Sequence, residues 1–213
     1  MNKRVSMLVA CSIMLVSGLV IGWGLWQRHE IGQEQATQSK ILKQKEASLA
    51  TIKSSYNQTL LKEALQSGDG TVVQNAQVVA TQTKFDQTVN KFFNVVFTFS
   101  NNKEYLARAN KAKAYATDDV LKNQKLFNDG KDSTGHSYVD SADLSVSFDN
   151  ASVANSVVAD DGTMTGYVTV RYYAQTGDST PGISTVAFLV TYNSKTNLLT
   201  KVTQLGSLSN ESM

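Results

Sequence analysis

The sequence predicts an α+β fold in which helices come first and an antiparallel sheet follows. Apolar residues recur with a period near 3.6 up to about residue 127, and with a period of two after about residue 142. Short turn motifs rather than helical crossovers join the later segments, so we expect successive strands to pair antiparallel. An uncharged apolar stretch precedes this domain at the N-terminus.

The apolar stretch, Val5–Trp26, predicts a transmembrane helix. Its 22 residues contain no charged side chain, and that length crosses a hydrocarbon core of about 30 Å. Lys3 and Arg4 precede it, so the positive-inside rule places residues 1–4 in the cytoplasm and the remainder outside the cell. The residues predicted to contact lipid or its outer interface include Val5, Leu15, Leu19, Trp23 and Trp26.

A signal peptide or a lipidation signal would fit this stretch less well. A cleavable signal peptide has an apolar run of roughly 7–15 residues followed by small residues, whereas this run is longer and ends in Trp26. Leu8–Cys11 matches the pattern that precedes a lipidated cysteine, but only six residues separate Arg4 from Cys11. We therefore expect an uncleaved anchor.

Residues 27–68 predict a helical stalk, because they are rich in Gln, Lys, Glu, Ala and Leu and contain no Pro. Two alternatives stay open: a solvated spacer, or a coiled coil that associates with another helix. Lys45 and Thr59 interrupt the seven-residue pattern. The apolar residues that follow the pattern, and that would make a protein contact, are Leu42, Leu49, Ile52 and Tyr56.

Residues 69–208 predict the α+β domain, which begins with about three helices. The first runs from Thr71 to about Ser100, with Asp69 or Thr71 as its N-cap. The second starts near Asn102 as its cap and buries Tyr105, Leu106, Ala109 and Ala112. The third begins at Thr117–Asp119 and ends at Asp129–Gly130.

Four strands follow, and their period of two predicts a sheet with one buried face. The turns at Asp160–Gly162 and Gly177–Gly182 separate the second strand from its neighbours. We expect a four-stranded antiparallel meander that curls around the long first helix, and a C-terminal tail over residues 209–213. The strands are Ala142–Phe148, Gly166–Gln175, Ile183–Tyr192 and Leu198–Leu205.

Strand alternation places Tyr167 and Tyr173 on the face opposite Val168, Val170 and Tyr172. An exposed aromatic face is a possible protein contact through Tyr167 and Tyr173. The alternative is that these rings cover the open side of the sheet.

The sequence predicts no catalytic, cofactor-binding or metal site, because it lacks the common phosphate-binding, nucleophile-elbow and zinc motifs. His29 and His136 are too few for a typical zinc site. The Asp118–Asp119 and Asp160–Asp161 pairs fit helix-start and turn positions better than paired catalytic carboxylates. The positions expected to face the inside of the sheet are apolar: Val168, Val170, Phe188 and Val190.

Charge and cysteine content narrow the classes of partner. Net charge is +2 with acids and bases interspersed, so we expect no direct nucleic-acid binding. The only cysteine, Cys11, lies inside the apolar stretch, so no intrachain disulfide forms. A polar outer domain without disulfides fits a Gram-positive cell surface.

The order of a short cytoplasmic end, one span, a stalk, helices and a four-stranded sheet resembles the bitopic inner scaffold subunit of type IV secretion and conjugation systems. The likeness is carried by the Val5–Trp26 span, the Phe-rich Asn90–Phe99 segment and the Gly166–Gln175 and Ile183–Tyr192 strands. Because of its small size and polar surface, the chain looks most like the Gram-positive-type subunits.

The resemblance implies a nuclear-transport-factor-like outer domain and a role without enzymatic activity. Such a subunit is anchored in the cell membrane, oligomerises and contacts other channel subunits while DNA is transferred. The sequence also leaves open a second function, an extracytoplasmic module that binds a small ligand or senses it at the inner face of the sheet.

Overall fold

The computed structural model describes residues 41–212 except 43, 46–47, 50 and 156–157, and it divides into two compact units between Lys62 and Glu63. The described residues of the first unit are helical, in agreement with the predicted stalk. The predicted transmembrane helix and residues 27–40 of the stalk lie outside the described residues. Within the described part of the chain, no helix is both long and apolar enough to cross a membrane.

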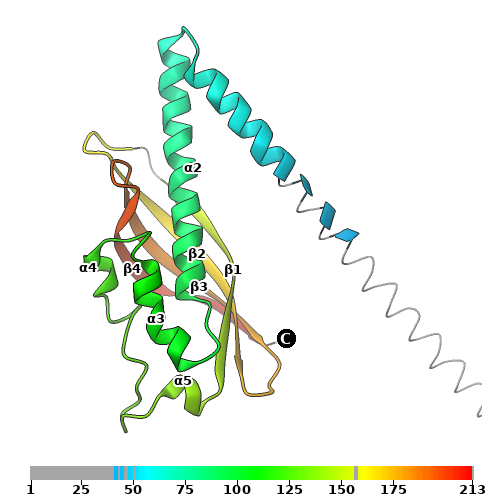
Figure 1. The fold of residues 1–213 in the computed structure, drawn as a ribbon, viewed down its shortest axis with the longest axis vertical. Coiled ribbons are helices and arrows are strands. Elements are labelled where there is room, and N and C mark those ends of the chain that lie inside the picture. The colour runs from blue at the N-terminus through cyan, green and yellow to red at the C-terminus, as the bar shows by residue number, and fades with distance from the viewer. Residues whose placement is uncertain (1–40, 43, 46–47, 50, 156–157, 213) are drawn as a thin grey trace, which may run out of the picture. The chain divides into compact units, whose positions relative to one another are not determined.

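Helix α2 (Gly70–Val96) is the long helix of the second unit (Figure 1). Asp69 caps it, since its Oδ1 accepts a hydrogen bond of 2.8 Å from the backbone N–H of Thr71. The predicted end near Ser100 is wrong by four residues. Phe99 instead forms a bridge to Val146 of the sheet, with N–O distances of 3.0 and 2.8 Å, and this extended pairing is incompatible with helix.

Three shorter helices follow: α3 (Asn102–Ala112), α4 (Asp118–Leu121) and α5 (Tyr138–Ser141). The predicted third helix is mostly wrong, because only four of its residues are α-helical. Helix α5 was not predicted from the sequence. The predicted cap of α3 at Asn102 is wrong by one residue, because Asn101 accepts the hydrogen bond from the backbone N–H of Glu104 at 2.9 Å.

The sheet is the predicted antiparallel meander, with spatial order β1-β2-β3-β4. The C-terminal tail predicted over residues 209–213 is wrong for residues 209–212. Strand β4 continues beside β3, and Ser212 still pairs with Gly182. The first strand begins two residues after the predicted Ala142. The bounds are β1 Leu144–Asn155, β2 Thr163–Thr176, β3 Gly182–Asn193 and β4 Leu198–Ser212.

The helices of the second unit cover one face of this sheet, here called the inner face (Figure 1). Aromatic side chains of α2 pack on it: the Phe93 and Phe188 ring centroids are 4.7 Å apart, and those of Phe85 and Tyr192 are 5.2 Å apart. The four positions predicted to face inward are at most 1% exposed. On the opposite, outer face, Tyr167, Thr169 and Arg171 are exposed.

Polar groups from the helical layer bind the edge of β1. The Asn90 side-chain amide makes two hydrogen bonds of 3.2 Å with Ala151, one to its N–H and one to its carbonyl. Together with the Phe99 bridge, this amide occupies backbone groups that an incoming strand would need. Leu199, near the start of β4, is bound in the same way by the Tyr115 carbonyl and the Thr117 N–H, each at 2.9 Å.

Gly166 is expected to be sensitive to substitution, because a Cβ there would lie 2.9 Å from Cε1 of Phe85. Gly166→Ala should lower the free energy of unfolding by about 1–3 kcal/mol through overpacking. Gly206→Ala is the matched control, since a Cβ there meets no atom within 4 Å. Thermal denaturation of the full chain, followed by the near-ultraviolet dichroism of its tyrosines, measures both. Equal effects of the two changes would contradict the close packing of Gly166 on Phe85.

Candidate functional site

Arg108 belongs to α3 and lies where that helix meets two other segments, and it is 5% exposed. Its Nε donates to the Tyr105 carbonyl at 2.8 Å, and its Nη1 donates to the Val96 carbonyl at 2.7 Å. Its Nη2 donates to the Leu126 carbonyl at 3.2 Å. One guanidinium therefore joins the C-terminal end of α2, helix α3 and the segment that follows α4.

Aromatic rings surround the same guanidinium. Its central carbon lies 3.6 Å from the ring centroid of Tyr105 and 5.0 Å from that of Phe99. Burial lowers the pKa of Arg108, but an arginine keeps its charge at any physiological pH. The Val96 carbonyl belongs to the negative end of α2, whose last turn has no basic residue, so Arg108 complements that helix dipole.

Arg108 was not among the residues predicted from the sequence, because the buried stripe of α3 was assigned to its apolar residues. The structure buries Tyr105, Arg108 and Ala112 and leaves Leu106 49% exposed. The predicted burial of Leu106 is therefore wrong. Positions 105, 108 and 112 lie on one side of the helix. The burial of Arg108 could therefore have been predicted from its spacing relative to Tyr105 and Ala112.

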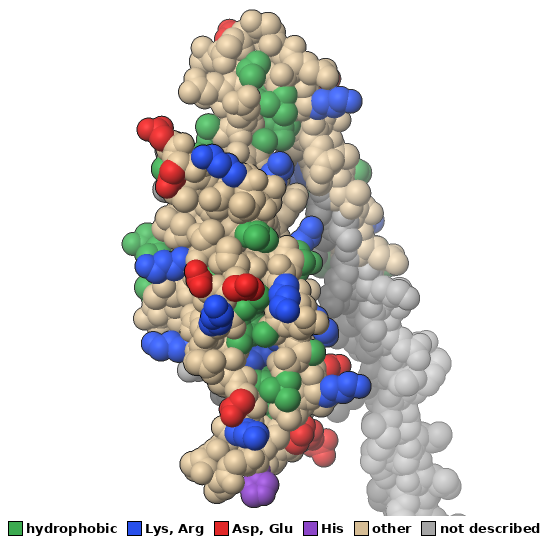
Figure 2. All heavy atoms as spheres, turned by 60° about the vertical axis from the view of Figure 1, so that its left-hand side comes forward, with side chains coloured by type: hydrophobic (Ala, Val, Ile, Leu, Met, Phe, Trp, Pro, Cys, Tyr) green, Lys and Arg blue, Asp and Glu red, His purple; other side chains and the backbone are tan. Residues whose placement is uncertain are grey.

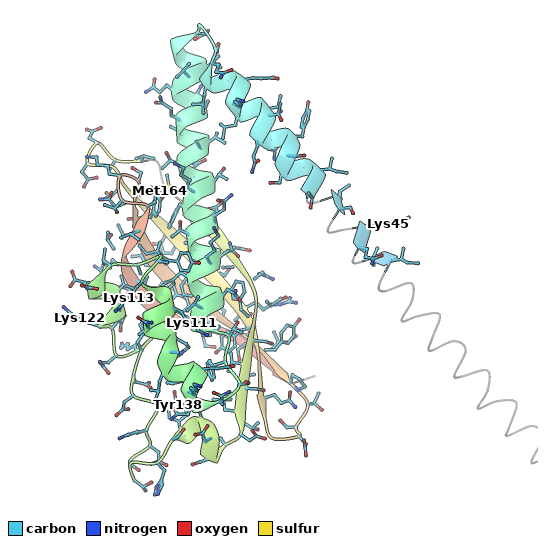
Figure 3. The ribbon with its side chains drawn as sticks, viewed as in Figure 1. Lys45, Lys111, Lys113, Lys122, Tyr138 and Met164 are labelled. Carbon is cyan, nitrogen blue, oxygen red and sulfur yellow. The ribbon has the colours of Figure 1, made fainter. Side chains whose placement is uncertain are left out.

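A second polar network adjoins Arg108. The Tyr138 hydroxyl donates to the Tyr105 hydroxyl, which donates to Oδ1 of Asn128 at 2.7 Å. Oδ1 of Asn128 also accepts from the Gly130 N–H at 2.9 Å, which fixes the orientation of this amide. Burial, together with the hydrogen bond to Tyr105, raises the pKa of Tyr138 to about 12. Figure 3 shows Tyr138 where α5 approaches α3.

A cavity of about 240 Å³ lies beside these two networks, between the helices and the inner face of the sheet. Arg108, Tyr138 and Asn128 line it, and Lys125 and Gln204 add two more polar side chains. The apolar part of its wall comes from both layers and includes Val96, Phe97, Val146, Tyr172 and Val186. The sheet thus contributes mainly apolar side chains, with Gln204 of β4 as a polar exception, and the helical layer supplies further hydrogen-bond donors.

The structure separates the two predicted contact tyrosines. Tyr167 is 64% exposed on the outer face. Tyr173 is half-buried in a wider groove of about 600 Å³ beside the Phe99 bridge. Glu104 also lines this groove, and hydrogen bonds from Ser100 lower the pKa of its carboxyl group. The two tyrosines thus differ in exposure, and a protein contact through either one stays a prediction.

The predicted contact residues of the stalk are all exposed within this chain. Leu42, Leu49, Ile52 and Tyr56 each keep more than half of their surface open. The structure describes no second helix that would distinguish a solvated spacer from a coiled coil, so both alternatives remain predictions.

The remaining titratable residues considered from the sequence lie in capping and loop positions. Asp118 and Asp119 form the first turn of α4, and Oδ1 of Asp161 accepts a hydrogen bond of 2.8 Å from the Thr163 N–H. His136 is exposed, and its Nδ1 lies 2.8 Å from the Thr134 hydroxyl. Among the described residues, no group of three or more His, Cys, Asp or Glu side chains is arranged to hold a metal ion.

No protein-family model, curated protein or solved structure matches the chain. Two features of the second unit are therefore the basis for inferring a function. One is the donor-lined cavity beside Arg108, and the other is the exposed outer face of the sheet with Tyr167.

Arg108→Met should destabilise the second unit, because it leaves three buried carbonyls without their donor. We expect the free energy of unfolding to fall by about 2–4 kcal/mol. Lys111→Met, an exposed position on the same helix, should change it by less than about 0.5 kcal/mol. Chemical denaturation of the full chain followed by circular dichroism measures both. A stable Arg108→Met variant would show that the three hydrogen bonds are dispensable.

Tyr138 should make stability depend on alkaline pH. Its folded-state pKa of about 12 lies above the ordinary 10.0, so the folded chain keeps a proton that the unfolded chain releases. This contribution is complete below about pH 10 and is lost as the pH rises through 12. The stability of Tyr138→Phe should therefore fall less steeply between pH 10 and 12 than that of the unmodified chain. Tyr167→Phe, on the exposed face, is the control, and identical slopes for all three chains would refute the assignment.

Proposed function

We propose that this chain is a membrane-anchored, non-enzymatic scaffold subunit of a conjugative type IV secretion channel of the Gram-positive type. It supports DNA transfer through contacts with other channel subunits and with further copies of itself. The observation that carries the proposal is the exposed apolar surface on the outer face and on the edge strand β4 of the second unit.

This surface includes a row across all four strands. Tyr167 pairs with Ala154 of β1 and with Leu189 of β3, and Leu189 pairs with Thr203 of β4. Directly paired residues point to the same side of a sheet, so the row places Ala154, Tyr167 and Leu189 together on the outer face. Exposed aromatic and aliphatic residues in one patch are typical of protein-contact surfaces.

Two exposed leucines extend the apolar surface at the edge of the sheet. Leu205 is 52% exposed and Leu208 is 62% exposed. Each leucine is skipped in the pairing of β4 with β3. Gln204 and Gly206 pair with two successive residues of β3, which leaves Leu205 unpaired, and Ser207 and Ser209 do the same on either side of Leu208. An extra residue at such a bulge is left outside the ladder, and a leucine there is available to another protein.

The architecture supports the more detailed fold assignment. In the nuclear-transport-factor-like arrangement that we propose, a long helix and shorter helices pack on one side of a curled antiparallel sheet. Here α2 packs mainly on β1, α4 packs on β4, and the strands follow one another as a meander. The proposal places the second unit outside the cell, with the Val5–Trp26 helix in the cell membrane and residues 1–4 in the cytoplasm.

The charge pattern favours protein rather than nucleic-acid contacts. Figure 2 shows acidic and basic side chains interspersed over one face of the described chain, without a basic stripe. A surface that binds a phosphate backbone directly gathers its lysines and arginines along one face or groove. In this proposal the DNA contacts other subunits, and the present chain holds those subunits in place.

Photocrosslinking in donor cells tests the contact surface. A photoreactive phenylalanine at Tyr167 in the full-length chain should crosslink to channel subunits, which mass spectrometry then identifies. The same residue at Leu106, which is exposed on α3, is the matched control and should give fewer such products. Recovery of the secretion ATPase and other channel subunits is the expected result. Crosslinks to unrelated proteins, or no difference between the two positions, would refute the proposal.

Tyr167→Ser should lower conjugation when it replaces the unmodified chain in donor cells. Loss of one central interface aromatic typically costs about 1–2 kcal/mol of binding, so we expect transfer to fall about tenfold. Leu106→Ser should leave transfer unchanged. Immunoblots must show equal amounts of both variants in the membrane fraction. Normal transfer with Tyr167→Ser would show that this face carries no essential contact.

A further inference from the structure

We propose that the cavity beside Arg108 binds a small organic carboxylate. This inference goes beyond the scaffold function and does not depend on it, because the site lies on the inner face of the sheet and the proposed contacts lie on the outer face. It names a class of ligand, small organic carboxylates, for the ligand-binding function that the sequence left open.

The guanidinium of Arg108 keeps donors that the protein does not use. An arginine has five N–H donors in a planar fork, and three of them bind the carbonyls of Val96, Tyr105 and Leu126. Nη1 and Nη2 each retain one further N–H. Among the described residues Arg108 makes no salt bridge with a carboxylate, and its charge is met by carbonyl dipoles and by the faces of Tyr105 and Phe99. A carboxylate supplies the full countercharge that a buried cation favours.

The polar groups of the cavity lining are mostly donors. Besides Arg108, the residues that line the cavity include Lys125, which carries an ammonium group, and Asn128 and Gln204, which carry side-chain amides, and no Asp or Glu is among them. Oδ1 of Asn128 is already held by two donors, so its remaining polar group is the N–H₂. Tyr138 keeps its phenolic proton, because burial raises its pKa. A site with two cations and amide donors selects an anion.

The size and shape of the cavity limit the ligand to a small molecule with an apolar part. A volume of about 240 Å³ equals about eight waters at roughly 30 Å³ each, and it is smaller than the roughly 300–1,000 Å³ of drug-sized pockets. An acid of a few carbon atoms fits this space. The apolar walls include Phe97, Tyr172 and Val186. An organic carboxylate has an apolar body for these walls, whereas inorganic phosphate has none.

Saturation-transfer NMR on the full-length chain tests the proposal with butyrate and glutarate as probes. Butyramide has nearly the shape of butyrate without its charge, and inorganic phosphate has charge without an apolar body. We expect saturable binding of at least one acid, no saturable binding of butyramide, and no displacement of the acid by equimolar phosphate. Equal binding of butyrate and butyramide, or no binding of either acid at millimolar concentration, would overturn the proposal. Displacement by phosphate would replace it with an inorganic oxyanion site.

Variants assign the bound probe to this cavity without disturbing the Arg108 hydrogen bonds. Lys125→Gln removes the second cation and should weaken acid binding about fivefold, a typical effect for one partly exposed charge. Gln204→Glu puts a competing carboxylate in the cavity and should weaken binding at least as much. Lys122→Gln is the matched control, because this exposed lysine, labelled in Figure 3, is three residues from Lys125 and is not among the residues that line the cavity. Unchanged affinity in both cavity variants would place the acid elsewhere and refute the assignment.

Discussion

The hydrogen bonds of Arg108 to three carbonyls are the interaction on which the helical layer depends. Each carbonyl belongs to a different segment, and the helices that follow α3 are too short to hold their places alone. Helix α4 has only four residues and α5 has four, and such short helices are not stable in isolation. A planar cation with several donors can satisfy three backbone groups at once in a fixed geometry, which the flexible ammonium of a lysine does not match.

Burying a charge in this position is costly, and the surroundings show how the cost is offset. The guanidinium donates a hydrogen bond to the Val96 carbonyl at the negative end of α2. It also lies against the faces of Tyr105 and Phe99. The Phe99 bridge to Val146 then connects this cluster to the edge of β1. The same group of residues therefore ends α2, blocks part of a sheet edge and forms one wall of the cavity.

The parts of the fold that the sequence predicted are those with a strong local period. The alternation in β2 and β3 and the phenylalanine spacing of α2 were interpreted correctly, because each depends on one buried face. The errors have tertiary causes. Helix α2 ends early because Phe99 finds a partner in β1, and β4 continues past Leu205 because β3 pairs with it as far as Ser212. Arg108 was missed because only apolar residues were assigned to the buried side of α3, although its helical spacing from Tyr105 and Ala112 was a usable signal.

The outer face and the cavity use alternate residues of the same strands, and this arrangement separates the two proposed functions. On β2, Tyr172 lines the cavity, whereas Tyr167 is exposed on the outer face. On β3, Val186 lines the cavity, whereas Leu189 belongs to the outer row with Tyr167. A partner on the outer face thus needs none of the side chains that a ligand would contact. The sheet is nevertheless one strand layer thick, so both surfaces share its backbone, and a change in strand twist that affects one must affect the other.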